Sequence, residues 1–217
     1  MSRAPDRDDL PVGADIAVAG LLATASALLD RRPSTHLLAE LQPLLAALAP
    51  QAPVSTPRFI DRLLGRDLVR AAHPDPVEAR IRLHLQRSAV HAEATEAHIG
   101  ALDGSLRAID AWLATAPAAT NAATANEARR AEALHATVLT TRAQLALARS
   151  TALAILEQYR HLRDLLVPLW RQASAAEAAG AHAEVAQGLA ELRTSLAHRL
   201  HDLHATASLS SRPESTT

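Results

Sequence analysis

The sequence predicts an all-α fold: a long antiparallel, coiled-coil-like helical hairpin with a shorter third helix and short N-terminal helices. Of the 217 residues, 48% are hydrophobic but only 2% are aromatic, and alanine and leucine supply most of the hydrophobic side chains. Both favour helices, whereas the β-branched and aromatic residues that favour strands are scarce. In two long segments, apolar side chains also recur at steps of four and three, the spacing of coiled-coil core positions.

The N-terminal third is expected to be a flexible arm at 1–11 followed by short helices and a linker at 12–72. Apolar residues from Val18 to Leu29 recur at helical spacing until Pro33 ends the first helix. A second helix is expected to begin at Ser34, and Pro43 should break or kink it. Prolines and a glycine then mark a linker and one short helical turn, namely Pro50, Pro53, Pro57 and Gly65.

The hairpin and third helix are expected within 75–205. Asp75 as a cap, Pro76 in the first turn and Glu78 three residues after the cap are typical of a helix start. The predicted core positions of this first long helix are Ile81, Leu85, Ser88, Ala92, Thr95, Ile99, Leu102, Leu106, Ile109 and Leu113.

A second long helix follows a loop that begins near Pro117, and Pro168 should kink its far end. Its predicted core positions are Leu134, Val138, Thr141, Leu145, Ala148, Ala152, Ile155, Tyr159, Leu162, Leu166 and Leu169. Two matched apolar rows joined by a short loop favour an antiparallel hairpin, here drawn with Leu113 opposite Leu134. A third helix should follow Gly180, and residues 206–217 should form a disordered tail.

Charge and composition narrow the classes of function. The net charge of -1 supplies no basic field for nucleic acid, and the absence of cysteine excludes disulfides and thiolate metal sites. The apolar stretch 17–29 is too short to span a bilayer, and no secretory signal is evident, so the protein is expected in the cytoplasm. No nucleophile, phosphate-loop or dinucleotide motif occurs, so no catalytic residue and no cofactor are predicted.

Two candidate sites remain. His198, His201 and His204 are three residues apart on the third helix, so an adjacent pair could chelate a metal ion. Asn126 is read as a helix cap that brings Arg129 and Arg130 close to free backbone N–H groups, an arrangement suited to an anion.

The second long helix resembles the bacterial toxic-anion (tellurite) resistance family. The resemblance is carried by the segments 142–149, Leu153-Ala154-Ile155 and 159–166, together with 59–65 upstream, and covers about residues 58–172. This chain lacks the threonine-rich run that the family has after its second helix. The resemblance implies a cytoplasmic helical protein connected with resistance to tellurite or related stress, without catalytic residues to transfer.

The expected function is that of a non-enzymatic scaffold or adaptor, linked to tellurite resistance or envelope stress, that binds a protein partner or a second copy through its helices. The middle of the hairpin carries small core residues, so another helix should cover it, supplied by residues 12–49 or by another chain. One alternative is a peripheral membrane protein anchored by 12–49, and another is a helical enzyme or metal-binding protein without a known motif. The predicted interaction surface is Ala92, Thr95, Ile99, Ala148, Ala152 and Ile155.

Overall fold

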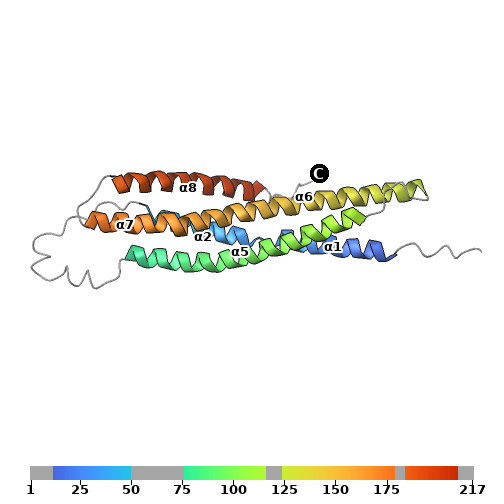
Figure 1. Cartoon of the computed structure of the whole chain (residues 1–217), viewed down its shortest axis with the longest axis horizontal. Helices are drawn as coiled ribbons and strands as arrows, with labels where there is room; N and C mark the ends of the chain where they lie inside the picture. Colours follow the sequence, from blue (N-terminus) through green and yellow to red (C-terminus); the bar gives the residue numbers. More distant parts are fainter. Residues whose placement is uncertain (1–11, 50–75, 116–123, 179–183, 210–217) are drawn as a thin grey trace, which may run out of the picture. The chain divides into compact units, whose positions relative to one another are not determined.

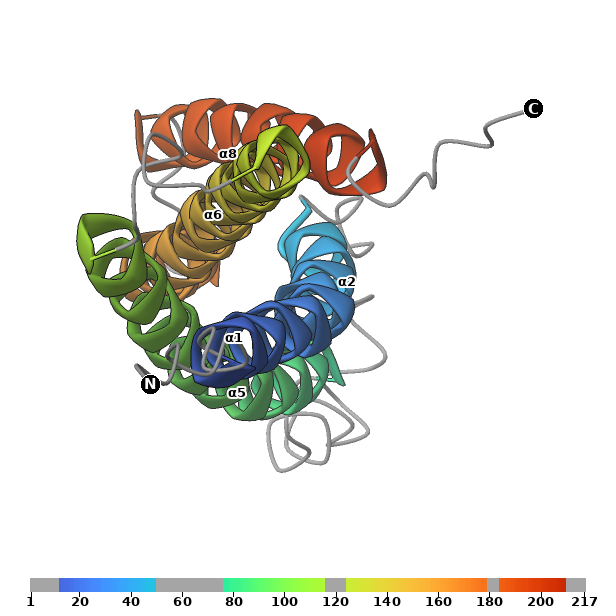
Figure 2. The ribbon, with the colours of Figure 1, turned by 90° about the vertical axis from the view of Figure 1, so that its right-hand side faces the viewer.

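A computed structural model describes residues 12–49, 76–115, 124–178 and 184–209, and every element in these ranges is a helix (Figures 1 and 2). The all-α class is therefore confirmed for this part of the chain. The expected arm, the turn at 59–65 and the tail beyond 209 lie outside the described residues. The elements are α1 (Val12–Asp30), α2 (Pro33–Ala47), α5 (Pro76–Thr115), α6 (Ala125–His161), the π-helix η2 (Leu162–Leu166), α7 (Val167–Ala178) and α8 (Glu184–Leu209).

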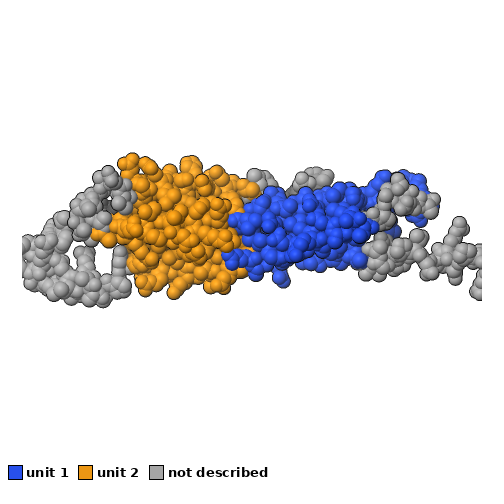
Figure 3. Space-filling model, in the orientation of Figure 1, with its two compact units in different colours: residues 1–32, 96–153 blue, residues 33–95, 154–217 orange. Residues whose placement is uncertain are grey.

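The chain forms two compact units (Figure 3). Unit 1 comprises Met1–Arg32 and Glu96–Leu153, and thus holds α1 with the C-terminal part of α5 and most of α6. Unit 2 comprises Pro33–Thr95 and Ala154–Thr217, and holds α2, the start of α5, the end of α6, η2, α7 and α8. Each unit has buried apolar side chains of its own.

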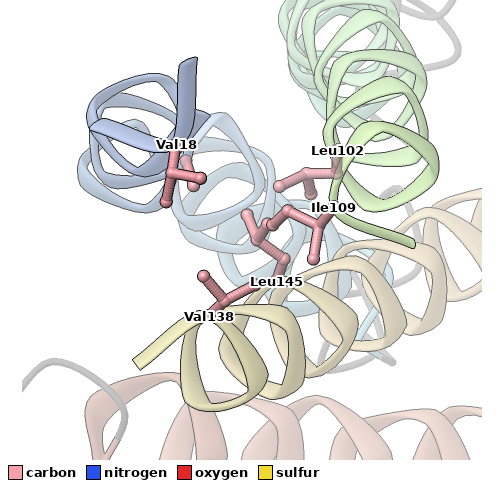
Figure 4. Close-up of a cluster of buried hydrophobic side chains, with 6 residues drawn as sticks. Val18, Leu102, Ile109, Val138 and Leu145 are labelled. Atoms are coloured by element: carbon pink, nitrogen blue, oxygen red, sulfur yellow. The ribbon is translucent and has the colours of Figure 1, made fainter. Parts of the chain in front are cut away.

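The core of unit 1 is built from three helices (Figure 4). Val18 of α1, Leu102 and Ile109 of α5, and Val138 and Leu145 of α6 point toward one another. Leu102 and Leu145 are fully buried, and each such side chain stabilises the fold by about 1.5–3 kcal/mol relative to an exposed one.

The core of unit 2 is richer in leucine. Leu37, Leu41 and Leu44 of α2 are fully buried, and α2 packs against α8. α8 in turn contacts α7 and η2. The remaining buried side chains of this core include Ile81, Ile155, Tyr159, Leu162, Leu166, Leu196 and Leu200.

The helical spacing identified the inward side chains correctly. Every core position expected on the two long helices is buried or half-buried. Among these, the Thr95 hydroxyl lies in the interior and donates to the carbonyl of His91 at 2.7 Å, so its burial leaves no unmade hydrogen bond.

Of the break or kink expected at Pro43, the break is wrong, because α2 continues through this residue to Ala47. Pro43 is exposed, while Leu41 and Leu44 on either side are fully buried. Burial of the leucine face holds this helix together despite the hydrogen bond that proline removes.

A wide π turn lies just before Pro168, where a kink was expected. Its backbone hydrogen bond is donated by the N–H of Val167 to the carbonyl of Leu162. Pro168 has no N–H for the carbonyl four residues earlier, which gives a physical reason for a changed hydrogen-bond pattern here. The helix then resumes as α7.

Helix α8 extends to Leu209, into the segment 206–217 that was expected to form a disordered tail. Thr206 donates its hydroxyl to the carbonyl of Asp202 at 2.9 Å, a contact made within a continuous helix. Alanine, the best helix former, occupies 205 and 207 and favours this extension.

Candidate functional site

The most distinctive surface of unit 1 is an apolar face of α6. Leu139, Leu147 and Leu153 are 45%, 54% and 38% exposed. None of the three belongs to the core positions predicted from the spacing. Leucines left over once the core of a helix has been assigned are a signal of a second apolar face, and the sequence interpretation did not use it.

Small side chains complete this surface, which we call the α6 outer face: Leu139, Ala143, Ala146, Leu147, Ser150 and Leu153. At 3.6 residues per turn, the six lie within roughly a third of the helix circumference, turned away from the buried face. The only polar member, Ser150, donates its hydroxyl to the carbonyl of Leu147 at 2.9 Å. The hydroxyl proton of Ser150 is therefore already engaged, and the face is apolar in character.

Two ion pairs join α6 to α5 within unit 1. The Arg142 Nε lies 2.5 Å from Asp110 Oδ1, and Arg149 pairs with Asp103. The hydrogen bond from Arg142, helped by its charge, lowers the pKa of Asp110, and the same contact raises the pKa of Arg142. These pairs show that α5 and α6 lie side by side in unit 1.

In the alignment drawn from the sequence, with Leu113 opposite Leu134, Asp103 would lie opposite Gln144. In the structure the ion-pair partner of Asp103 is Arg149, and an arginine side chain is long enough to pair with a residue several positions along the neighbouring helix. Rows of apolar residues at steps of three and four fit several alignments.

The predicted interaction surface lies inside the chain. Thr95 and Ile155 are fully buried in unit 2, while Ile99 and Ala152 are buried in unit 1. Ala148 is half-buried and packs against the core cluster that contains Val18 and Ala25 of α1. The predicted surface, which also includes the buried Ala92, is therefore corrected: α1 supplies the expected covering helix in unit 1.

The histidines proposed as metal ligands are exposed on α8. No cluster of three potential metal ligands occurs among the described residues, so the structure does not bring His198, His201 and His204 into a common site. His198 and His201 do share the lining of one cavity, which also receives residues from α2.

The helix cap assigned to Asn126 belongs to Thr124. Thr124 Oγ1 accepts from the N–H of Glu127 at 3.3 Å, and Glu127 Oε2 accepts from the N–H of Thr124 at 2.9 Å, a reciprocal capping box. Asn126 Oδ1 instead accepts from Arg129 at 3.1 Å. This corrects the geometry on which the anion site at Asn126, Arg129 and Arg130 was based.

Part of the apolar surface of the leucine-rich segment 12–49, which a membrane anchor would expose, is buried in the structure. Val18 and Ala25 face the core of unit 1, and the main leucines of α2 face that of unit 2. None of the described helices combines the length and apolarity needed to cross a bilayer.

Three histidines of α5, seven residues apart, contact or lie near the N-terminal helices. His84 binds Glu40, and the ring of His91 stacks on that of His36 in unit 2. In unit 1, burial first and the charge of Arg31 second lower the pKa of His98. Their spacing of seven residues places these histidines on a common face of α5.

No protein-family model, curated protein or solved structure matches this chain.

Proposed function

We propose that this protein is a non-enzymatic helical scaffold or adaptor that binds a helix of a partner through the α6 outer face. The partner helix comes from another protein or from a second copy of the chain. The observation that carries this proposal is the exposure of Leu139, Leu147 and Leu153 on one side of a helix whose other side is already packed.

The spacing of the face suits a helical partner. Leu139, Ala146 and Leu153 recur at seven-residue intervals, and Leu147 lies beside them. A partner helix with apolar residues at the same repeat would cover all of them, and the alanines allow close approach. Removing exposed apolar surface from water favours association by about 25 cal/mol per Å².

In this proposal α5 and α6 form an antiparallel, coiled-coil-like hairpin, in which α5 supports α6 and leaves the α6 outer face exposed. Two observations favour it. As the residue number rises from Asp103 to Asp110 on α5, it falls from Arg149 to Arg142 on α6. The buried positions of both helices also follow the steps of three and four.

The proposed cellular setting is the cytoplasm, and the process served is resistance to tellurite or related stress. This setting rests on the resemblance of the segment 142–166 to the toxic-anion resistance family. Growth of the native host on tellurite tests it, using a deletion strain that carries either the wild-type chain or a variant of the α6 outer face. Equal tolerance with and without the protein would remove the tellurite link and leave the scaffold proposal standing.

The scaffold proposal is tested by placing charge on the face. Leu139→Glu with Leu147→Glu should abolish binding of a partner or self-association, because burying an unpaired carboxylate is costly. Gln144→Glu adds one such charge to an exposed position outside the face, and it is the matched control for Leu147→Glu alone, which should also weaken binding. Sedimentation velocity of the purified proteins and affinity capture from the host read out the complex, and circular dichroism checks that the helices persist.

A further inference from the structure

A cavity of about 510 Å³, open to solvent and lined mostly by exposed side chains, lies where α2 packs against α8 in unit 2. One wall is formed by α2 through Gln42, Leu45 and Ala46, and the other by residues of α8. Its size falls within the range of small-molecule sites in proteins, roughly 300–1,000 Å³. The α8 residues that line it are Arg193, Thr194, Ala197, His198 and His201.

The ionisable side chains in the lining are all bases. Arg193 carries a permanent positive charge, His198 and His201 gain one on protonation, and no aspartate or glutamate lines the cavity. Gln42 adds an amide, while the Thr194 hydroxyl already donates to the carbonyl of Ala190 at 2.8 Å. The cavity is therefore electrostatically suited to an anion.

Arg193 has a hydrogen-bond donor that no described residue satisfies. Its Nε is buried and has no hydrogen-bond acceptor among the described residues. A buried guanidinium N–H without an acceptor is costly, and most such groups in proteins are bonded. The Nε is shielded in this conformation, so a ligand oxygen would satisfy this donor once the Arg193 side chain turns toward the cavity.

The rest of the lining determines what kind of anion would fit. Leu45, Ala46 and Ala197 are apolar and contribute to both walls. An inorganic oxyanion would use only the basic side chains and leave the apolar walls uncovered. An amphiphilic ligand would bury its apolar part against them while its charged end meets the donors.

We propose that this cavity binds an organic carboxylate with an aliphatic portion. Its carboxylate accepts from Arg193 with His198 and His201 beside it, and its aliphatic part packs on Leu45, Ala46 and Ala197. The proposal is separate from the α6 outer face, which lies in unit 1, whereas every residue of the cavity lies in unit 2.

The test uses octanoate as the probe and the full-length chain in isothermal titration calorimetry, with octanol and inorganic phosphate as comparison ligands. The wild-type chain should bind octanoate more tightly than either, because only octanoate has both the charge and the aliphatic part. Arg193→Gln should weaken octanoate binding about tenfold or more, because it removes the charged donor. Arg199→Gln is the control: it deletes the same charge from an exposed position of α8 that does not line the cavity, and it should bind as the wild type does.

A second variant, His198→Asn with His201→Asn, keeps the proposal testable if Arg193→Gln does not fold, and it should also weaken binding of octanoate. Failure of the wild-type chain to bind octanoate would overturn the proposal. So would equal binding of octanol or of phosphate, because the first would show that charge is not used and the second that the apolar walls are not. Equal affinity of Arg193→Gln and Arg199→Gln would likewise contradict it.

Discussion

The Glu40 carboxylate and the His84 imidazole bind each other in unit 2, with Oε2 of Glu40 3.1 Å from Nδ1 of His84. Nearby, the rings of His36 and His91 stack with centroids 5.8 Å apart and planes 24° from parallel. The two contacts lie at residues 84 and 91 of α5 and at residues 40 and 36 of α2. The residue number therefore rises along α5 while it falls along α2. Polar contacts thus fix how α2 lies on α5, in addition to the burial of its leucines.

Loss of a large core side chain should destabilise unit 1 far more than loss of an exposed one. Leu145 is fully buried in the three-helix cluster, so Leu145→Ala should lower the free energy of unfolding by about 2–5 kcal/mol. Leu139→Ala, on the outer face of the same helix, should change it by about 0.5 kcal/mol or less. Denaturant unfolding followed by circular dichroism compares the two, and equal losses would contradict the assignment of faces.

Alanine at helical glycines should stabilise the fold. Gly100 and Gly104 lie inside α5, and a Cβ added at either would meet nothing within 4 Å. Each replacement should therefore raise the free energy of unfolding by about 0.8–1 kcal/mol, the difference in helix propensity. Thermal unfolding of Gly104→Ala should give a higher midpoint than the wild type, and a lower one would indicate that the position is packed.

The start of α6 should depend on Thr124 rather than on Asn126. Thr124→Ala removes one arm of the capping box and should cost about 1 kcal/mol. Asn126→Ala removes only an exposed contact with Arg129 and should cost less. Amide hydrogen exchange of the first turn of α6 measures the effect locally, and faster exchange in the Asn126 variant alone would restore the original assignment.

The pKa of His98 is lowered from 6.5 by burial and, second, by Arg31, which gives a pH dependence of stability with a definite sign. Because the unfolded state binds the proton more readily, the free energy of unfolding should fall as pH drops below 6.5 toward the lowered pKa. His98→Gln removes this contribution, so the free energy of unfolding of the variant relative to the wild type should increase as the pH falls through this range. Arg31→Gln should remove part of it. The measurement is the free energy of unfolding of the wild type and of His98→Gln between pH 7.5 and pH 5, roughly the range in which histidine titrates. A difference between the two proteins that stays constant over this range would contradict this account.

Much of the helix pattern could be predicted because local propensity and apolar spacing act along the chain. Val138, Leu145 and Ala152 are buried as the steps of seven require. The break at Pro43 was mispredicted because tertiary burial of Leu41 and Leu44 outweighs a local penalty. Such burial depends on residues distant in sequence.

The candidate site was harder to predict for the same reason. Spacing shows that Ala148 faces inward but not what it packs against, which in unit 1 is the core cluster that includes Val18 and Ala25 of α1. The cavity beside Arg193 depends on the meeting of α2 and α8, about 150 residues apart, and no spacing rule along one helix reports it.

Site-specific photo-crosslinking tests the central claim, that the α6 outer face binds a partner helix, most directly. A benzophenone amino acid at position 147 in the native host should form a discrete adduct, with another protein or with a second copy of the chain. The same group at position 144, exposed on α6 but outside the face, should form little or none. No adduct at 147, or equal adducts at the two positions, would contradict the account.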